Sequence, residues 1–81
     1  MIASESKLKQ VLADVFGVDA ATVGEQSSVD SIAAWDSLNH LNLVLALEEQ
    51  FGVSFSEEQI VEMMNYPLVK AVLEEAGVEF R

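Results

Sequence analysis

Hydrophobic residues recur at helical spacing near the start of the chain. Four of them follow the i, i+3, i+4, i+7 pattern of a helix that buries one face: Leu8, Val11, Leu12 and Val15. Ser4 is suited to cap the start of this helix, and Gly17 is suited to the left-handed turn that ends it. The pattern therefore predicts a first helix from Ser4 to Phe16.

A longer apolar pattern predicts a second helix, from Ser37 to Phe51. Asp36 precedes this helix as its N-cap, and Gly52 stands just past its end. Residues 18–35 are expected to form a long loop with a brief helical turn near its start. A loop of this length in a small domain is usually functional or held in place by contacts with the core.

Two shorter helices are expected in the last third of the chain. One covers residues 57–64, because Ser56 and Gln59 fit a capping box. The other covers residues 67–76, with Pro67 in its first turn, where the missing N–H group is no loss. Its inward-facing residues are expected to be Leu68, Val69, Val72 and Leu73.

The second helix carries two apolar stripes. A core stripe combines His40, Leu43, Val44, Leu47 and Phe51. A second stripe, apolar in its middle, combines Leu38, Leu41, Asn42, Leu45 and Glu49. A chain of 81 residues is too small to surround a helix completely, so the three leucines of the second stripe are expected to form a contact patch. In the alternative, they pack under the long loop or the third helix.

These patterns predict one all-α domain over residues 1–81: an antiparallel bundle of three main helices plus one short helix, with a long loop between the first and second helices. The chain has no cysteine and one histidine, so no metal site is expected. No apolar run reaches membrane-spanning length, and no signal segment appears, which favours a cytoplasmic protein. The net charge of −10 disfavours nucleic acid and favours basic protein partners.

The chemistry-bearing motif is Asp36-Ser37-Leu38, at the start of the second helix. The run from Trp35 to Val53, with Glu-Glu-x-Phe-Gly near its end, resembles the attachment site and recognition helix of acyl carrier proteins. The resemblance extends over nearly the whole chain. It implies that Ser37 carries a 4′-phosphopantetheine arm donated by coenzyme A, with Asp36 and Leu38 completing the motif.

The resemblance also implies a function and partners. The expected protein is a monomeric, non-enzymatic carrier that holds acyl thioesters on the arm and passes them between enzymes of fatty-acid-like or specialised lipid or polyketide synthesis. Its expected partners are a phosphopantetheinyl transferase and basic-surfaced acyl-transferring or acyl-modifying enzymes. They would bind Leu38, Leu41, Asn42, Leu45, Glu48, Glu49 and Glu57. Asn39 and Asn42 are neutral where fatty-acid synthesis members usually carry acidic residues, which favours a specialised stand-alone bacterial carrier.

Carriers of this family can shelter the acyl chain between their helices. The expected lining is Val29, His40, Val44, Leu47, Ile60, Met63 and Leu68. For each of these residues, ordinary core packing is the alternative. Trp35 either packs over the loop or borders the arm.

Three other functions remain open at this stage. The chain also fits an aminoacyl or peptidyl carrier of nonribosomal synthesis or D-alanine transfer, because such carriers share the fold and the attachment chemistry. An unmodified acidic adaptor would present the leucine patch without using Ser37. A hydrolase built on Ser37 and His40 is disfavoured, because the chain has no Gly-x-Ser-x-Gly elbow and no recognisable oxyanion hole.

Overall fold

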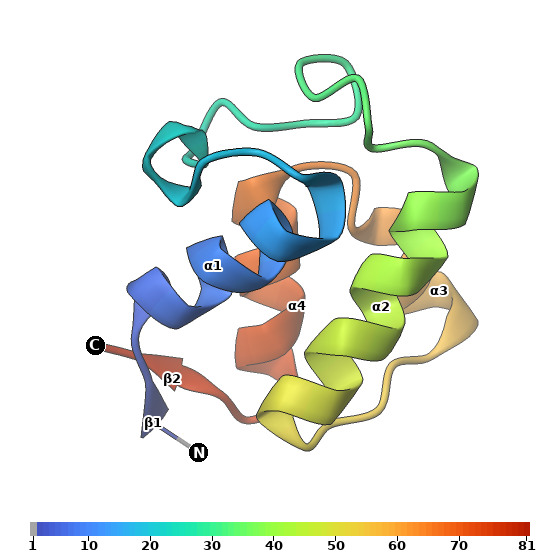
Figure 1. Cartoon of the computed structure of the whole chain (residues 1–81). Coiled ribbons are helices and arrows are strands. Elements are labelled where there is room, and N and C mark those ends of the chain that lie inside the picture. The colour runs from blue at the N-terminus through green and yellow to red at the C-terminus, as the bar shows by residue number, and fades with distance from the viewer. Residues whose placement is uncertain (1) are drawn as a thin grey trace.

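The computed structural model describes residues 2–81, which form a helical bundle with one short strand pair (Figure 1). The elements in chain order are β1 (Ile2–Ala3), α1 (Glu5–Phe16), the 3₁₀ turn η1 (Ala20–Thr22), α2 (Ser37–Phe51), α3 (Glu57–Glu62), α4 (Tyr66–Glu75) and β2 (Glu79–Phe80). This confirms the expected bundle of three main helices and one short helix. None of the described helices is both long and apolar enough to cross a membrane.

The caps of the first two helices are those that the sequence predicts. The Ser4 hydroxyl accepts a hydrogen bond from the Lys7 N–H at 3.2 Å, and the Asp36 carboxylate caps α2 in the same way. Gly17 and Gly52 end these helices with φ of 67° and 64°. Glycine suits both positions because a β-carbon disfavours this left-handed conformation.

The ends of the two later helices differ from the sequence prediction. The capping box of Ser56 and Gln59 is present, but α3 ends at Glu62 and not at residue 64. The fourth helix begins one residue before the expected start near Pro67, and Pro67 lies in its first turn as expected. The carboxamide of Asn65 caps α4 by accepting from the Leu68 N–H at 2.9 Å, so that helix begins at Tyr66.

The long loop explains the early end of α3. The Val29 N–H donates to the Met64 carbonyl at 3.1 Å, and the Tyr66 N–H donates to the Ser27 carbonyl at 2.9 Å. These bonds draw the backbone of residues 63–66 out of the helix and towards the loop. Figure 1 shows the loop crossing above the bundle between the ends of α1 and α2. It is therefore held in place by backbone pairing as well as by apolar side chains.

The core is formed by the inner faces of α1, α2 and α4, completed from the loops. Its buried members include Leu8, Leu12, Leu43, Leu47, Met63, Val69, Val72 and Leu73. Val23 and Trp35 reach it from the long loop, each only 3% exposed. Leu68 does not face inward as expected: it is 41% exposed. The buried stripe of α4 consists of Tyr66, Val69, Val72 and Leu73, and helical spacing places Leu68 outside that stripe.

The parallel pairing of β1 with β2 was not predicted. Ile2 is in register with Glu79, and Ala3 with Phe80. The Arg81 N–H also donates to the Ala3 carbonyl at 2.9 Å. Two-residue strands are too short to show an alternating pattern in a sequence. The pair brings the two ends of the described chain side by side (Figure 1).

An ion pair links α1 to α4 near this strand pair. The Lys70 ammonium bonds to the Glu5 carboxylate, and both side chains remain partly exposed. The hydrogen bond from Lys70 lowers the pKa of Glu5, and the same bond raises the pKa of Lys70. Since water reaches both groups, the pair adds little stability at physiological salt.

Candidate functional site

The start of α2 presents one hydroxyl to solvent. Ser37 is the first residue of the helix and is exposed. The Asp36 carboxylate accepts from the Asn39 N–H at 2.8 Å, and the Asp36 carbonyl accepts from the His40 N–H at 2.8 Å. The N–H groups of Ser37 and Leu38 stand at the positively polarised end of the helix. A phosphate group attached to the Ser37 oxygen would be favourably placed there.

Asn39 holds the segment that leads into this helix. Its side-chain amide donates to the Ala34 carbonyl at 2.8 Å, and its carboxamide oxygen accepts from Asn42 at 3.1 Å. A carboxylate at position 39 would have no hydrogen to donate to Ala34. The neutral side chain at position 39 therefore has a structural role.

Trp35 and His40 form a hydrogen-bonded pair beneath Ser37. The Trp35 indole stacks on the ring of Phe16, with centroids 4.8 Å apart, and is buried. Its Nε1–H donates to Nδ1 of His40 at 3.0 Å, and Nε2 of His40 lies 2.7 Å from the Ile60 carbonyl oxygen. Trp35 therefore packs into the core. Whether it also borders an arm on Ser37 stays a prediction.

A surface depression of about 510 Å³ opens next to Ser37. Its lining is mostly apolar and consists of Val29, Trp35, Asp36, Ser37, His40, Leu41 and Met64. The volume falls within the range of roughly 300–1,000 Å³ typical of small-molecule sites. Val29 and His40 were expected in such a lining from the sequence. Met64 was not, because the loop pairing that places it there joins residues 35 positions apart.

The other residues of the expected acyl lining lie elsewhere. Leu47 and Met63 are fully buried, and Val44 is 4% exposed, within the packed core. Ile60 is partly buried against that core, and its carbonyl faces His40. Leu68, exposed on α4, is not among the residues that line the depression. The structure thus brings two of the seven residues together beside Ser37.

The leucine patch of α2, comprising Leu38, Leu41 and Leu45, is open to solvent. Their exposed fractions are 70%, 55% and 64%. They do not pack under the loop or under α3, which was the alternative. Asn42, Glu49 and Glu57 are also exposed. Glu48 is different: its carboxylate accepts from the Phe55 N–H at 2.9 Å and so stabilises the turn between α2 and α3.

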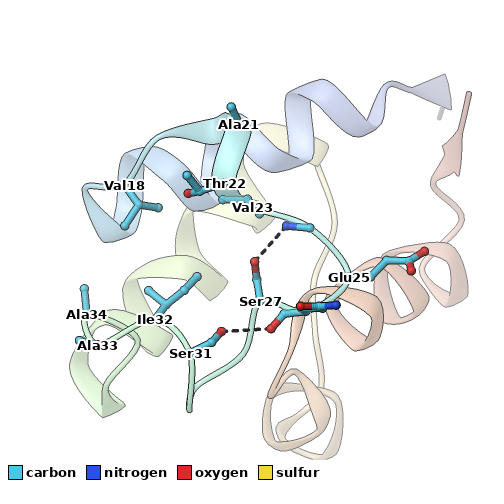
Figure 2. A pocket seen from close by; sticks show the side chains of 12 residues that line it. Val18, Ala21, Thr22, Val23, Glu25, Ser27, Ser31, Ile32, Ala33 and Ala34 are labelled. Atoms are coloured by element: carbon cyan, nitrogen blue, oxygen red, sulfur yellow. Dashed lines mark hydrogen bonds between the residues drawn. The ribbon is translucent and has the colours of Figure 1, made fainter.

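A larger depression, of about 720 Å³, lies within the long loop. Figure 2 shows it between the turn around Ala21 and the segment from Ser31 to Ala34. The Ser27 hydroxyl accepts from the Gly24 N–H at 2.9 Å, and the Ser31 hydroxyl donates to the Gln26 carbonyl at 3.1 Å. These hydroxyls stabilise the loop itself. The two depressions share no lining residue, so the larger one is separate from the site at Ser37.

Comparison with known proteins places this arrangement in a family. A family model described as "Phosphopantetheine attachment site" matches residues 6–76. An acyl carrier protein of Clostridium acetobutylicum is 36% identical over 76 residues, which cover 85% of this chain and 95% of that protein. The chain belongs to the acyl carrier protein family. An acyl carrier protein of Solidesulfovibrio magneticus is 45% identical over 53 residues, or 64% of this chain and 67% of its own length.

The fold agrees with this assignment. The solution NMR structure of a holo acyl carrier protein from Geobacter metallireducens superposes with a TM-score of 0.77 at 26% identity, covering 86% of this chain and 80% of the other. The protein is therefore a non-catalytic carrier of phosphopantetheine-linked intermediates. The residues at the start of α2 fit such a group, since they combine an exposed hydroxyl, free helix N–H groups and an adjacent apolar depression.

Proposed function

We propose that Ser37 receives the phosphopantetheine group and that the protein carries acyl groups in fatty-acid-like or specialised lipid or polyketide synthesis. The observation that carries this proposal is the position of Ser37, exposed as the first residue of α2 beside an apolar depression. Asp36 caps the helix through Asn39, which holds the serine at the helix end.

The attachment is a phosphoryl substitution. The Ser37 oxygen bonds to the phosphorus that bears pantetheine in coenzyme A, the bond to the adenosine bisphosphate leaving group breaks, and the serine proton passes to the transferase. When bound, phosphopantetheine supplies a terminal thiol that holds an acyl group as a thioester. The carrier's own residues would position this group: the N–H groups at the start of α2 would hold its phosphate, and the exposed leucine patch would bind the partner enzyme.

Partner enzymes are proposed to bind the leucine patch, with Asn42, Glu49 and Glu57 at its border. Burial of one leucine contributes about 1.5–3 kcal/mol before the cost of association is subtracted. The net charge of −10 steers basic surfaces towards the carrier. This combination suits repeated, transient binding. We further propose that the carrier is a monomer and works in the cytoplasm.

Intact-mass analysis tests the attachment site. The unmodified protein is incubated with coenzyme A and a promiscuous phosphopantetheinyl transferase. We expect one added group on the wild type and none on Ser37→Ala. Ser54→Ala is the matched control, because Ser54 is also exposed and lies in the turn before α3. Modification of Ser37→Ala, or an unchanged wild-type mass, would contradict the proposal.

Identification of the cargo requires the native host. Proteolytic peptides that contain Ser37 are isolated under conditions that preserve thioesters, and the attached group is identified by mass. A fatty-acyl or polyketide-like group supports the proposal. An amino acid or peptide would show instead that the protein is an aminoacyl or peptidyl carrier.

A further inference from the structure

The inner wall of the depression beside Ser37 is closed by a hydrogen-bonded bridge. His40 of α2 accepts from Trp35 at 3.0 Å through Nδ1, which leaves the hydrogen of its neutral ring on Nε2, 2.7 Å from the Ile60 carbonyl of α3. Trp35 is in turn stacked on Phe16 of α1. One imidazole thus links α2 to α3 and to the segment that packs on α1.

The packed core begins directly behind this bridge. Val44 and Leu47 stand one and two turns further along the same face of α2 as His40, at exposures of 4% and 0%. Met63, the residue that follows α3 as its C-cap, is also fully buried. The depression itself is lined by His40 and Trp35 and by none of these three residues. A chain that extends inward from Ser37 therefore meets the bridge before it reaches the space between α2 and α3.

Entry past the bridge has a cost that does not depend on chain length. Separating α2 from α3 here breaks the bond to the Ile60 carbonyl, and displacing His40 also leaves the Trp35 N–H without its acceptor. These groups lie in a largely apolar setting, where unpaired donors and acceptors are strongly disfavoured. The depression outside the bridge offers apolar contact with Val29, Leu41 and Met64 at no such cost.

We propose that the Trp35–His40–Ile60 bridge is a gate that keeps the acyl chain out of the interhelical core, so that His40 limits how long a chain this carrier can shelter. This inference rests on the proposed attachment at Ser37. The wild type is then suited to acyl groups short enough to lie in the depression, and longer chains remain exposed to solvent and to partner enzymes.

Chain-length series test the gate. Wild type, His40→Ala and Gln50→Ala are loaded by a promiscuous transferase with acetyl-, butyryl-, octanoyl- and dodecanoyl-coenzyme A. Gln50 is an exposed residue of α2 remote in sequence from the depression and serves as the control. For each form, the melting temperature and the rate of thioester cleavage by hydroxylamine are measured.

For the wild type and Gln50→Ala, we expect the melting temperature not to rise as the acyl group lengthens from butyryl to dodecanoyl. The rate of thioester cleavage should also be the same for these acyl groups. In His40→Ala, the longer chains should raise the melting temperature, because they bind only the folded protein. They should also slow cleavage about tenfold, which corresponds to a thioester sheltered about 90% of the time. Strong protection of octanoyl on the wild type would overturn the gate, as would identical chain-length profiles for wild type and His40→Ala.

If His40→Ala does not fold, NMR of the wild type can still show whether the acyl chain enters the interhelical core. The methyl signals of Leu47 and Met63 should coincide between acetyl- and dodecanoyl-loaded protein. A shift of these buried methyls with chain length would show that the acyl chain enters the core. If no acyl group attaches to Ser37 in any variant, the proposed attachment is wrong and the proposed gate is wrong with it. If acyl groups attach but chain length has the same effect in wild type and His40→Ala, only the gate is wrong.

Discussion

The Trp35 indole N–H donates to Nδ1 of His40 across a distance of 3.0 Å. Because Nδ1 accepts this bond, the neutral imidazole carries its hydrogen on Nε2 and donates it to the Ile60 carbonyl. The pair therefore joins the residue before the N-cap of α2 to α3. This hydrogen-bonded pair fixes the conformation of the segment that contains Ser37.

A double-mutant cycle measures this bond. We expect Trp35→Phe and His40→Phe each to reduce the free energy of unfolding, since each leaves a partly buried partner without its bond. The double variant should be less destabilised than the sum of the two, with a coupling energy of about 0.5–1.5 kcal/mol. Urea unfolding of the three variants and the wild type provides the values. Strictly additive losses would show that the two side chains do not interact.

Asn39→Asp is expected to destabilise the protein. A carboxylate in the first turn of α2 gains about 0.3–1 kcal/mol from the helix dipole. It loses the hydrogen bond to the partly buried Ala34 carbonyl and leaves that acceptor unpaired, at a cost of about 1–3 kcal/mol. The loss is the larger effect, so the free energy of unfolding should fall.

Asn42→Asp is the control for this substitution. It introduces the same charge one turn later, where the side chain is exposed and bonds only to Asn39 among the described residues. Its effect should stay within about 0.5 kcal/mol. Equal free energies of unfolding for the two variants in urea titrations would contradict the structural role of Asn39.

Tyr66→Phe should stabilise the protein at neutral pH or leave its stability unchanged. The Tyr66 hydroxyl is buried and has no hydrogen-bond partner within the part of the chain that the structure describes. Its removal relieves an unsatisfied polar group, for a gain of up to about 1 kcal/mol. A clear loss of stability in thermal unfolding at pH 7 would show that the hydroxyl has a partner.

The same residue makes the protein sensitive to alkali. Burial, together with the nearby carboxylates of Glu5 and Glu25, raises the pKa of Tyr66 to about 12. In the unfolded chain its pKa is about 10. Between these values the folded protein keeps a proton that the unfolded chain releases, so stability falls as the pH rises. Tyr66→Phe should lose less stability than the wild type over this interval. Because Tyr66 is the only tyrosine, ultraviolet titration of the folded protein measures its pKa directly.

Added salt should raise the melting temperature. Fourteen acidic residues face four basic ones, so mutual repulsion of carboxylates opposes folding. At about 0.01 M salt the screening length is about 30 Å, comparable with the longest dimension of the molecule, 29 Å. At about 0.15 M it falls to about 8 Å, and most of this repulsion is removed. Thermal melts over this range provide the test, and a constant or falling melting temperature would exclude net repulsion.

Local sequence signals were sufficient to predict the helices and the position of Ser37 at the start of α2. The caps at Ser4, Asp36 and Ser56 depend on residues three positions apart, and the stripes of α2 depend only on helical spacing. The exposure of Leu38 and Leu41 followed from the same projection, because a small chain cannot cover both faces of a helix.

Contacts between distant residues were decided only in three dimensions. The sequence by itself determined the four helices, the exposed serine at the start of α2 and the leucine patch beside it, since each depends on neighbours within a few turns. The tertiary structure decided the end of α3, the short strand pair, the turning of Leu68 to solvent and the bridge from Trp35 through His40 to Ile60. These features depend on which backbone groups from separate segments find one another when the core packs, and no local spacing encodes that pairing.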